Sequence, residues 1–127
     1  MDQAFATFDD ITDALTDYFN GIYEGDAEKL QRVFHENARL YSATDGDVVK
    51  MELSEYLDLI RGRPSPESQG VTRSDRIISI DTAGTESAAV KVELSVPPKY
   101  FTDLLTLLRV DGKWRIISKI YHYEIYE

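Results

Sequence analysis

Apolar side chains recur at spacings of three and four residues over the first part of the chain. They are Phe8, Ile11, Leu15, Tyr18 and Ile22. Residues at these spacings lie on one stripe of an α-helix, so the segment is predicted to be a helix with one buried side. Gly21 and Gly25 are expected to mark its end, because glycine is favoured just past the last helical turn.

Two shorter helices are predicted from capping residues that precede apolar positions. Asp26 can cap a second helix that reaches Phe34, and residues 35–37 then break the helical pattern. Ser54 can cap a third helix, which the glycine and prolines within residues 62–66 end. The first half of the chain is therefore predicted to hold three helices.

Most of the remaining apolar positions predict strands. Residues 88–96 alternate between apolar and polar side chains with a period of two, as expected of a strand. Asp45-Gly46 and Asp111-Gly112 are strong hairpin turns between such segments. The predicted strands are residues 38–43, 48–51, 76–81, 88–96, 100–110 and 113–123.

The turn at Asp111-Gly112 predicts a register for the last two strands. The facing pairs would be Val110 with Lys113, Arg109 with Trp114, Leu107 with Ile116, Leu105 with Ser118, Asp103 with Ile120, and Phe101 with His122. Facing residues share a side of the sheet, so Asp103 and His122 are expected on one side, diagonally across the hairpin. A single β-bulge would swap the faces beyond it.

Both sides of this predicted hairpin are substantially apolar. An antiparallel sheet commonly leaves one face polar, so each face here is expected to need a cover. Helices can cover one face, and a second copy of the chain can cover the other. The pattern therefore predicts a homodimer formed through a sheet face.

Composition limits the classes of partner. The chain has 127 residues, which fits a single domain over residues 1–127. It carries 14 Lys and Arg against 23 Asp and Glu, a net charge of −9, so neither nucleic acid nor an anionic membrane is an expected partner. It has no cysteine, which excludes disulfides, thiolate zinc sites and cysteine nucleophiles.

The start of the chain bears on location. Residues 1–10 include Asp2, Asp9 and Asp10 and no basic residue. A secretory signal begins with a positively charged region, so none is expected here. No apolar run approaches the roughly 20 residues that span a bilayer. We therefore expect a cytoplasmic protein.

Several strings carry a resemblance to a known family. They are Gly25-Asp26 and residues 34–38, 101–103, 107–114 and 115–119. Together with the predicted order of elements, they resemble the putative lumazine-binding family of the nuclear-transport-factor-2-like (SnoaL-like) superfamily, from about Phe8 to Glu124. The resemblance implies an α+β, cystatin-like cone, in which three N-terminal helices pack on a curved, mixed, mostly antiparallel sheet. It also implies an open pocket and dimers on the outer face of the sheet.

The same superfamily contains ketosteroid-isomerase-like enzymes, which suggests a comparison of catalytic positions. Such an enzyme would want a tyrosine on the first helix, and Tyr18 matches. It would want a carboxylate base on the first strand and an acid on the penultimate strand, where this chain aligns Ser42 and Thr106. Two of the three roles are therefore missing in this alignment, which argues against isomerase chemistry.

The candidate catalytic residues are Tyr18, Asp103, His35 and His122, because a carboxylate can orient a histidine and raise its basicity. We expect each histidine more readily as a hydrogen-bonded structural residue. No metal-ligand spacing is present, so neither metal nor cofactor is expected. The residues predicted to line the pocket are Tyr18, Ile22, Phe34, His35, Tyr41, Tyr56, Ile60, Leu105, Trp114 and His122.

The first functional hypothesis is a domain that binds a small hydrophobic or aromatic molecule in an apolar, tyrosine-lined pocket without catalysis. The second is an isomerase, dehydratase or cyclase that acts on a small hydrophobic carbonyl compound, using Tyr18, Asp103 and one histidine. The third is a dimerisation domain without a working pocket. The sequence leaves these three open.

Overall fold

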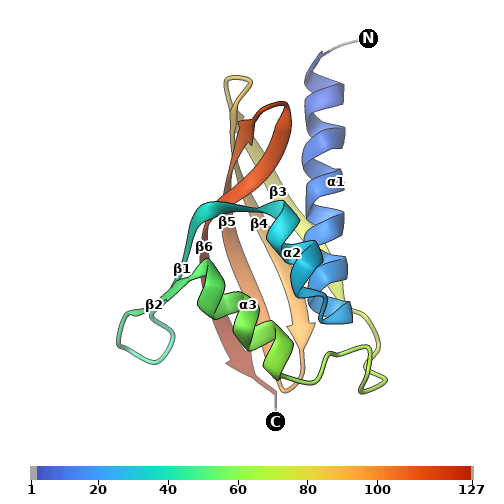
Figure 1. Ribbon diagram of the computed structural model, residues 1–127, viewed down its shortest axis with the longest axis vertical. Coiled ribbons are helices and arrows are strands. Elements are labelled where there is room, and N and C mark those ends of the chain that lie inside the picture. The colour runs from blue at the N-terminus through green and yellow to red at the C-terminus, as the bar shows by residue number, and fades with distance from the viewer. Residues whose placement is uncertain (1–2, 127) are drawn as a thin grey trace.

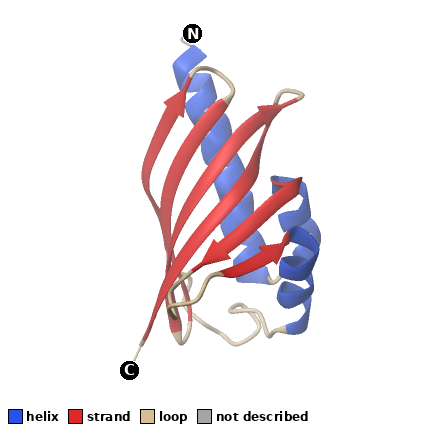
Figure 2. Ribbon diagram, turned by 90° about the vertical axis from the view of Figure 1, so that its left-hand side faces the viewer, coloured by secondary structure: helices blue, strands red, loops and turns tan. Residues whose placement is uncertain are grey.

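Three helices lie against one face of a curved six-stranded sheet, as Figures 1 and 2 show from two directions. The computed structural model describes residues 3–126. Met1 and Asp2, part of the acidic start considered above, lie outside this range. No helix within it combines the length and the apolar character that a bilayer crossing requires.

The order of elements matches the prediction. The elements are α1 (Gln3–Glu24), α2 (Ala27–Val33), β1 (Phe34–Ser42), β2 (Val49–Glu52), α3 (Leu53–Gly62), β3 (Asp75–Ala83), β4 (Ser87–Val96), β5 (Lys99–Val110) and β6 (Lys113–Ile125). The strand order is β2-β1-β6-β5-β4-β3, with β1 parallel to β6 and the other neighbours antiparallel. The predicted α+β fold with a mixed, mostly antiparallel sheet is confirmed.

The end of the first helix differs from the prediction. Gly21 lies inside α1, and Gly25, with a φ of 70°, ends it. A Cβ atom on Gly21 would stand 2.7 Å from Cγ of Leu30 in α2. The glycine therefore serves the close packing of α1 on α2, because a side chain there would collide with the second helix.

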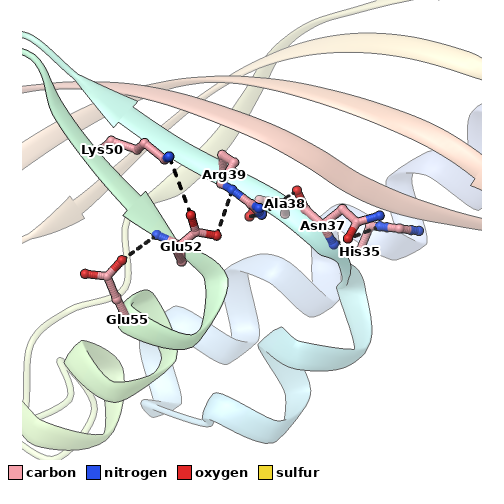
Figure 3. Close-up of polar contacts among 7 residues, drawn as sticks. All are labelled: His35, Asn37, Ala38, Arg39, Lys50, Glu52 and Glu55. Atoms are coloured by element: carbon pink, nitrogen blue, oxygen red, sulfur yellow. Dashed lines mark hydrogen bonds and ion pairs between the residues drawn. The ribbon is translucent and has the colours of Figure 1, made fainter.

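The two short helices begin at caps, one of which was predicted. The Asp26 carboxylate accepts a hydrogen bond of 3.0 Å from a backbone N–H in the first turn of α2, as expected. Helix α3 is capped by Glu52 rather than by Ser54, because Glu52 and Glu55 form a reciprocal capping box. Figure 3 shows that Glu52 also pairs with Arg39 of β1 at 2.7 Å, which ties the start of α3 to the sheet.

Strand β1 begins at Phe34, four residues earlier than predicted. Its pairing with β6 shifts register between Phe34 and Arg39. The segment 35–37, which breaks the helical pattern in the sequence, is therefore an irregular start of a strand.

The last hairpin contains a β-bulge that the turn alone does not predict. The register counted from the turn holds as far as the pair of Leu107 with Ile116. The next observed pair is Thr106 with Ser118, so Ile117 is an extra residue on β6. A bulge of this kind reverses which side of the sheet the following residues occupy.

The bulge corrects the predicted pairs further along β6. Asp103 faces Tyr121 rather than Ile120. The prediction that Asp103 and His122 share a face is therefore wrong, because one extra residue moves His122 to the other side. Lys119 moves with Tyr121 to the side of Asp103.

The helices cover the side of the sheet that holds the core. The largest fully buried side chains there are Tyr18, Phe34, Ile11, Leu15, Leu30, Leu40, Ile60, Leu105, Leu107, Ile116, Val92 and Asp103. The opposite side, which we call the outer face, carries Tyr41, Ile120 and Leu104 in one row of paired strand positions. Ile120 is 52% exposed and Leu104 is 50% exposed.

Candidate functional site

A carboxylate is buried on the helix-covered side of β5. Asp103 has no exposed surface, and the Tyr18 hydroxyl on α1 donates a hydrogen bond of 2.6 Å to its Oδ2. Lys119 of β6, which is 6% exposed, places its Nζ 3.8 Å from the same oxygen. The other oxygen, Oδ1, is buried without a hydrogen-bond partner among residues 3–126. Its lone pairs are therefore free to accept a proton.

The β-bulge brings Lys119 to this carboxylate. Lys119 faces Leu105, and Asp103 lies two residues further along β5 on the same side. Such diagonal neighbours lie within reach of long side chains. Without the extra residue Ile117, Ser118 would face Leu105 and Lys119 would point to the outer face.

Aromatic rings surround the Lys119 ammonium group. Its Nζ lies 4.7 Å from the ring centroid of Tyr56, 5.2 Å from that of Tyr18 and 5.7 Å from that of Tyr121. Ring faces attract a cation, so these contacts stabilise the ammonium group in this position. The Tyr56 hydroxyl accepts one N–H at 3.4 Å. An ammonium has three donors, which leaves others for an oxygen atom in the cavity.

Burial raises the pKa of both Tyr18 and Asp103, the two partners of this hydrogen bond. Desolvation raises the pKa of Asp103 above its ordinary value, while Lys119 and the bond from Tyr18 oppose that rise. Desolvation also raises the pKa of Tyr18 well above its ordinary value; Asp103 adds to the rise and Arg63 opposes it. Tyr18 therefore remains a donor, and Asp103 is a stronger base than an exposed aspartate.

A cavity of about 180 Å³ reaches this cluster from the surface. For scale, an engineered apolar cavity of about 150 Å³ in another protein binds benzene. Val49 and Leu59, each 45% exposed, belong to its wall, so it opens to solvent. Asp103, Lys119, Tyr56 and Tyr121 also line it, together with the apolar side chains of Ile22, Leu40, Met51, Leu94, Val96 and Phe101.

The predicted pocket residues fall into four groups. Ile22 and Tyr56 line the cavity. Phe34 and His35 border a separate surface hollow, together with Lys113. A third group lies in the core and lines neither the cavity nor the hollow: Tyr18, Ile60, Leu105 and Trp114.

Tyr41 and His122 lie on the outer side of the sheet. Tyr41 is paired with Ile120, which is on the outer face. His122 is exposed, and its Nδ1 lies 3.3 Å from Oγ1 of Thr44. Neither belongs to the lining of the cavity.

His35 makes a local hydrogen bond at the start of β1. Its Nδ1 accepts the backbone N–H of Asn37 at 3.0 Å, as Figure 3 shows. With His122 on the outer side, the histidines do not join Asp103, and Lys119 stands beside the carboxylate instead. No group of three His, Cys, Asp or Glu within residues 3–126 is placed to hold a metal ion.

The comparison with isomerase positions also changes. Thr106 lies exposed on the outer side, where its hydroxyl contacts that of Ser118. The carboxylate on the penultimate strand is Asp103, three residues earlier on the buried side. Ser42 is buried and lines the cavity. Asp103 therefore lies at the cavity, whereas Thr106, the position aligned from the sequence, does not.

Seven charged or aromatic lining residues are absent from the predicted catalytic and pocket residues: Asp45, Arg63, Lys99, Phe101, Lys119, Tyr121 and Tyr123. Lys119 and Tyr121 were placed on the wrong side by the missed bulge. One signal was available, because Ile116 and Ile117 are consecutive apolar residues that interrupt the alternation of β6. Arg63 and Lys99 follow or begin elements, where no periodicity indicates direction.

Comparisons with known proteins agree with this architecture. The profile of the family described as putative lumazine-binding matches residues 6–122. Aldolase FrzH from Cladobotryum sp is 29% identical over 105 residues, which make up 83% of this chain and 82% of that protein.

Two crystal structures share the fold over nearly the whole length. One, a nuclear-transport-factor-2-like protein of unknown function from Silicibacter pomeroyi, has a TM-score of 0.85 and 23% identity, covering 98% of this chain and 100% of that one. Another such protein, from Shewanella baltica, has a TM-score of 0.80 and 27% identity, covering 96% and 94%. The chain thus has the nuclear-transport-factor-2-like fold and belongs to the putative lumazine-binding family.

Proposed function

We propose that the protein binds a small carbonyl compound in the cavity and removes a proton from the carbon next to the carbonyl. The family and the fold support a ligand-binding domain. The observation that carries the catalytic part is the Asp103 carboxylate, which is fully buried at the cavity and has one oxygen without a hydrogen-bond partner in the described part of the chain. A buried charge is costly to maintain, so this arrangement is better explained by chemistry than by stability.

The proposed step balances as a proton transfer. Oδ1 of Asp103 takes the proton, and the electrons of the C–H bond form a carbon–carbon double bond. The carbonyl π electrons move to the carbonyl oxygen, which becomes an enolate. Return of a proton from Asp103 to the same carbon reverses the step, and in a β,γ-unsaturated ketone its delivery to the γ carbon moves the double bond and isomerises the compound.

Lys119 is proposed to stabilise the enolate oxygen. Its remaining N–H donors face the cavity, and the Asp103 carboxylate lines the same cavity. The Tyr56 hydroxyl lies beside it and also lines the cavity. Tyr18 is a positioning residue, because it holds Oδ2 of Asp103 from the core and leaves Oδ1 free.

The named relative supports this class of chemistry. An aldolase forms or breaks a carbon–carbon bond beside a carbonyl group, and such a reaction passes through an enolate or its enamine equivalent. The relative is 29% identical to this chain, so we carry over the class of intermediate and not its substrate. Lys119 is proposed to act as an ammonium and not as an amine nucleophile, because its Nζ lies 3.8 Å from an oxygen of Asp103 and beside three aromatic rings, a position that suits a cation.

Hydrogen–deuterium exchange tests the proposal directly. The protein is incubated in D₂O with acetophenone or cyclohexanone, and the loss of the α-proton signals is followed by NMR. We expect exchange above the buffer rate, and a drop of about 10²–10⁴-fold for Asp103→Asn, the range for loss of a general base. Asp81→Asn, at an exposed position on β3, is the matched control and should exchange like the wild type.

Equal exchange by Asp103→Asn and the wild type would overturn the role of Asp103. Binding of both ketones without any exchange above buffer would favour the non-catalytic binding domain. Reduction with borohydride during turnover should leave Lys119 unmodified in the mass spectrum. An adduct on that lysine would replace the enolate scheme with an enamine scheme.

We also propose a homodimer through the outer face. Tyr41, Ile120 and Leu104 form an apolar row there, and the last two are about half exposed. Exposed apolar groups in a contiguous row are typical of interaction surfaces. Ile120→Lys should convert a dimer to a monomer in analytical ultracentrifugation, and an unchanged sedimentation coefficient would contradict this interface.

A further inference from the structure

We propose that the compound bound in this cavity carries a carboxylate as well as a carbonyl, and that Arg63 and Lys99 bind that carboxylate at the mouth. The inference rests on the proposed function, which places the carbonyl at Asp103 and Lys119. It narrows the substrate class to small keto acids whose two polar groups are separated by an apolar body.

The charge of the lining is the first argument. The cavity wall has three cationic side chains, Lys119, Arg63 and Lys99, against the two carboxylates of Asp103 and Asp45. One positive charge is in excess, although the whole chain has a net charge of −9. The basic lining attracts an anion into the cavity, and the acidic surface of the rest of the protein repels it.

Arg63 is available to a ligand. It follows the last residue of α3, lines the cavity and is only partly exposed. It joins none of the ion pairs found among residues 3–126, whereas Arg61, two residues earlier, pairs with Asp58 at 3.3 Å. A guanidinium presents paired N–H donors that match the two oxygens of a carboxylate.

Lys99, the first residue of β5, also lines the cavity. Its Nζ lies 4.2 Å from the ring centroid of Tyr123. The Tyr123 hydroxyl donates a hydrogen bond of 2.8 Å to Oδ2 of Asp45, so the acid at the mouth already has a donor. Arg63 follows the last residue of α3, and Lys99 begins β5 after the β4–β5 turn. Figures 1 and 2 place the end of α3 and this turn at the same end of the molecule.

The wall between the two polar ends is apolar. Leu94, Val96 and Phe101 line the cavity together with Asp103 and Lys99. A volume of about 180 Å³ suits a body the size of one ring. The complementary molecule therefore has a ketone at one end, a ring or short hydrocarbon in the middle, and a carboxylate at the other end.

The probe 4-acetylbenzoate has this form, and methyl 4-acetylbenzoate is its neutral counterpart. Calorimetric titration of the wild type at low salt should give an affinity for the carboxylate at least about tenfold higher than for the ester, as expected for charge-assisted hydrogen bonds. Added salt should reduce this ratio. Arg63→Gln and Lys99→Gln should each bring the ratio towards one, whereas Arg61→Gln, which removes the same charge from the exposed side of α3, should keep it.

The results separate this inference from the proposed function. If acetophenone exchange depends on Asp103 but the ester binds as well as the carboxylate, the enolisation proposal stands and the carboxylate site is wrong. Failure of 4-acetylbenzoate to bind, or equal loss in Arg61→Gln and Arg63→Gln, would also overturn the site. Tighter binding of 4-acetylphenyl phosphate than of 4-acetylbenzoate would assign the mouth to phosphate instead.

Discussion

The two halves of the β5–β6 hairpin differ in what they bury on the same side of the sheet: one buries apolar residues and the other a pair of charged residues. Near the turn, Leu107, Trp114 and Ile116 are buried and apolar. Beyond the bulge, Asp103 and Lys119 occupy the corresponding positions and are buried just as completely. The strands are continuous through both halves, so the difference lies in the residues and in the one extra position between them.

The comparison separates stability from function. Burial of an apolar side chain stabilises the fold, whereas burial of an ion pair often yields less than an apolar replacement would. The half with the ion pair is also the half that borders the cavity. On the proposed function, the ion pair of Asp103 and Lys119 is kept at the cavity for chemistry rather than for stability, and each half should respond differently to mutation.

The largest effect is expected when the charge pair is broken from one side. Lys119→Met leaves Asp103 buried without its cation, and loss of one partner of a buried pair costs about 3–5 kcal/mol. Urea unfolding of the variant should show this loss as a lower midpoint. The double variant Asp103→Asn with Lys119→Met should recover much of the stability, because no unpaired charge remains. A double variant no more stable than Lys119→Met would contradict the importance of pairing.

Truncation in the apolar half should come next. Leu107→Ala removes a side chain that is 1% exposed, and such core truncations cost about 2–5 kcal/mol. Leu108→Ala changes the neighbouring residue on the outer face, which is 39% exposed, and should cost clearly less. The same unfolding experiment measures both. At urea concentrations too low to unfold it, Leu107→Ala should still exchange the α-protons of ketones, in contrast to Asp103→Asn.

The sequence predicts most of the fold because periodicity and turn residues specify it. The Asp111-Gly112 turn, the alternation in residues 88–96 and the helical stripe each correspond to an observed element. The residues that cap the helices are predicted less well, because Glu52 rather than Ser54 caps α3. Capping depends on which side chain reaches the backbone, and spacing alone does not specify this.

The site was harder to predict than the fold because its geometry depends on one residue. Counting from the turn gives the correct partners up to Ile116, and Ile117 then reverses the side of every later residue on β6. That single step exchanges His122 for Lys119 as the neighbour of Asp103. Tyr18 and Asp103 were both candidates from sequence, but their hydrogen bond joins residues 85 positions apart.

A smaller effect is expected from the hydrogen bond that supports the carboxylate. Tyr18→Phe removes the donor to Asp103 Oδ2, and a hydrogen bond to a charged group contributes about 1.5–3 kcal/mol. Tyr23→Phe removes a bond to the carbonyl of Val71 instead, a neutral bond worth about 1 kcal/mol. Because the bond from Tyr18 lowers the pKa of Asp103, its loss should also move the low-pH limb of ketone exchange to higher pH. Equal pH profiles for both variants would show that Tyr18 does not act through Asp103.

The smallest and most specific effect should be the pH dependence of stability. Burial raises the folded-state pKa of Asp103 above its unfolded value, near 3.9. The folded state then holds the proton more tightly, so stability from this group is present below the unfolded pKa and is lost as pH rises through the folded pKa. A tenfold difference in proton affinity between the folded and unfolded states corresponds to about 1.4 kcal/mol.

Asp103→Asn has no proton to lose, so it isolates this contribution. The unfolding free energy of the variant minus that of the wild type should rise as pH increases from about 4 and level off above the folded pKa of Asp103. Other carboxylates titrate in both proteins and cancel in the difference. The ion pair with Lys119 forms only when Asp103 is ionised, so its effect is already contained in the folded pKa of Asp103. A difference that falls with pH would mean that Lys119 and Tyr18 outweigh burial, and that Asp103 is held as a permanent counterion in place of a base.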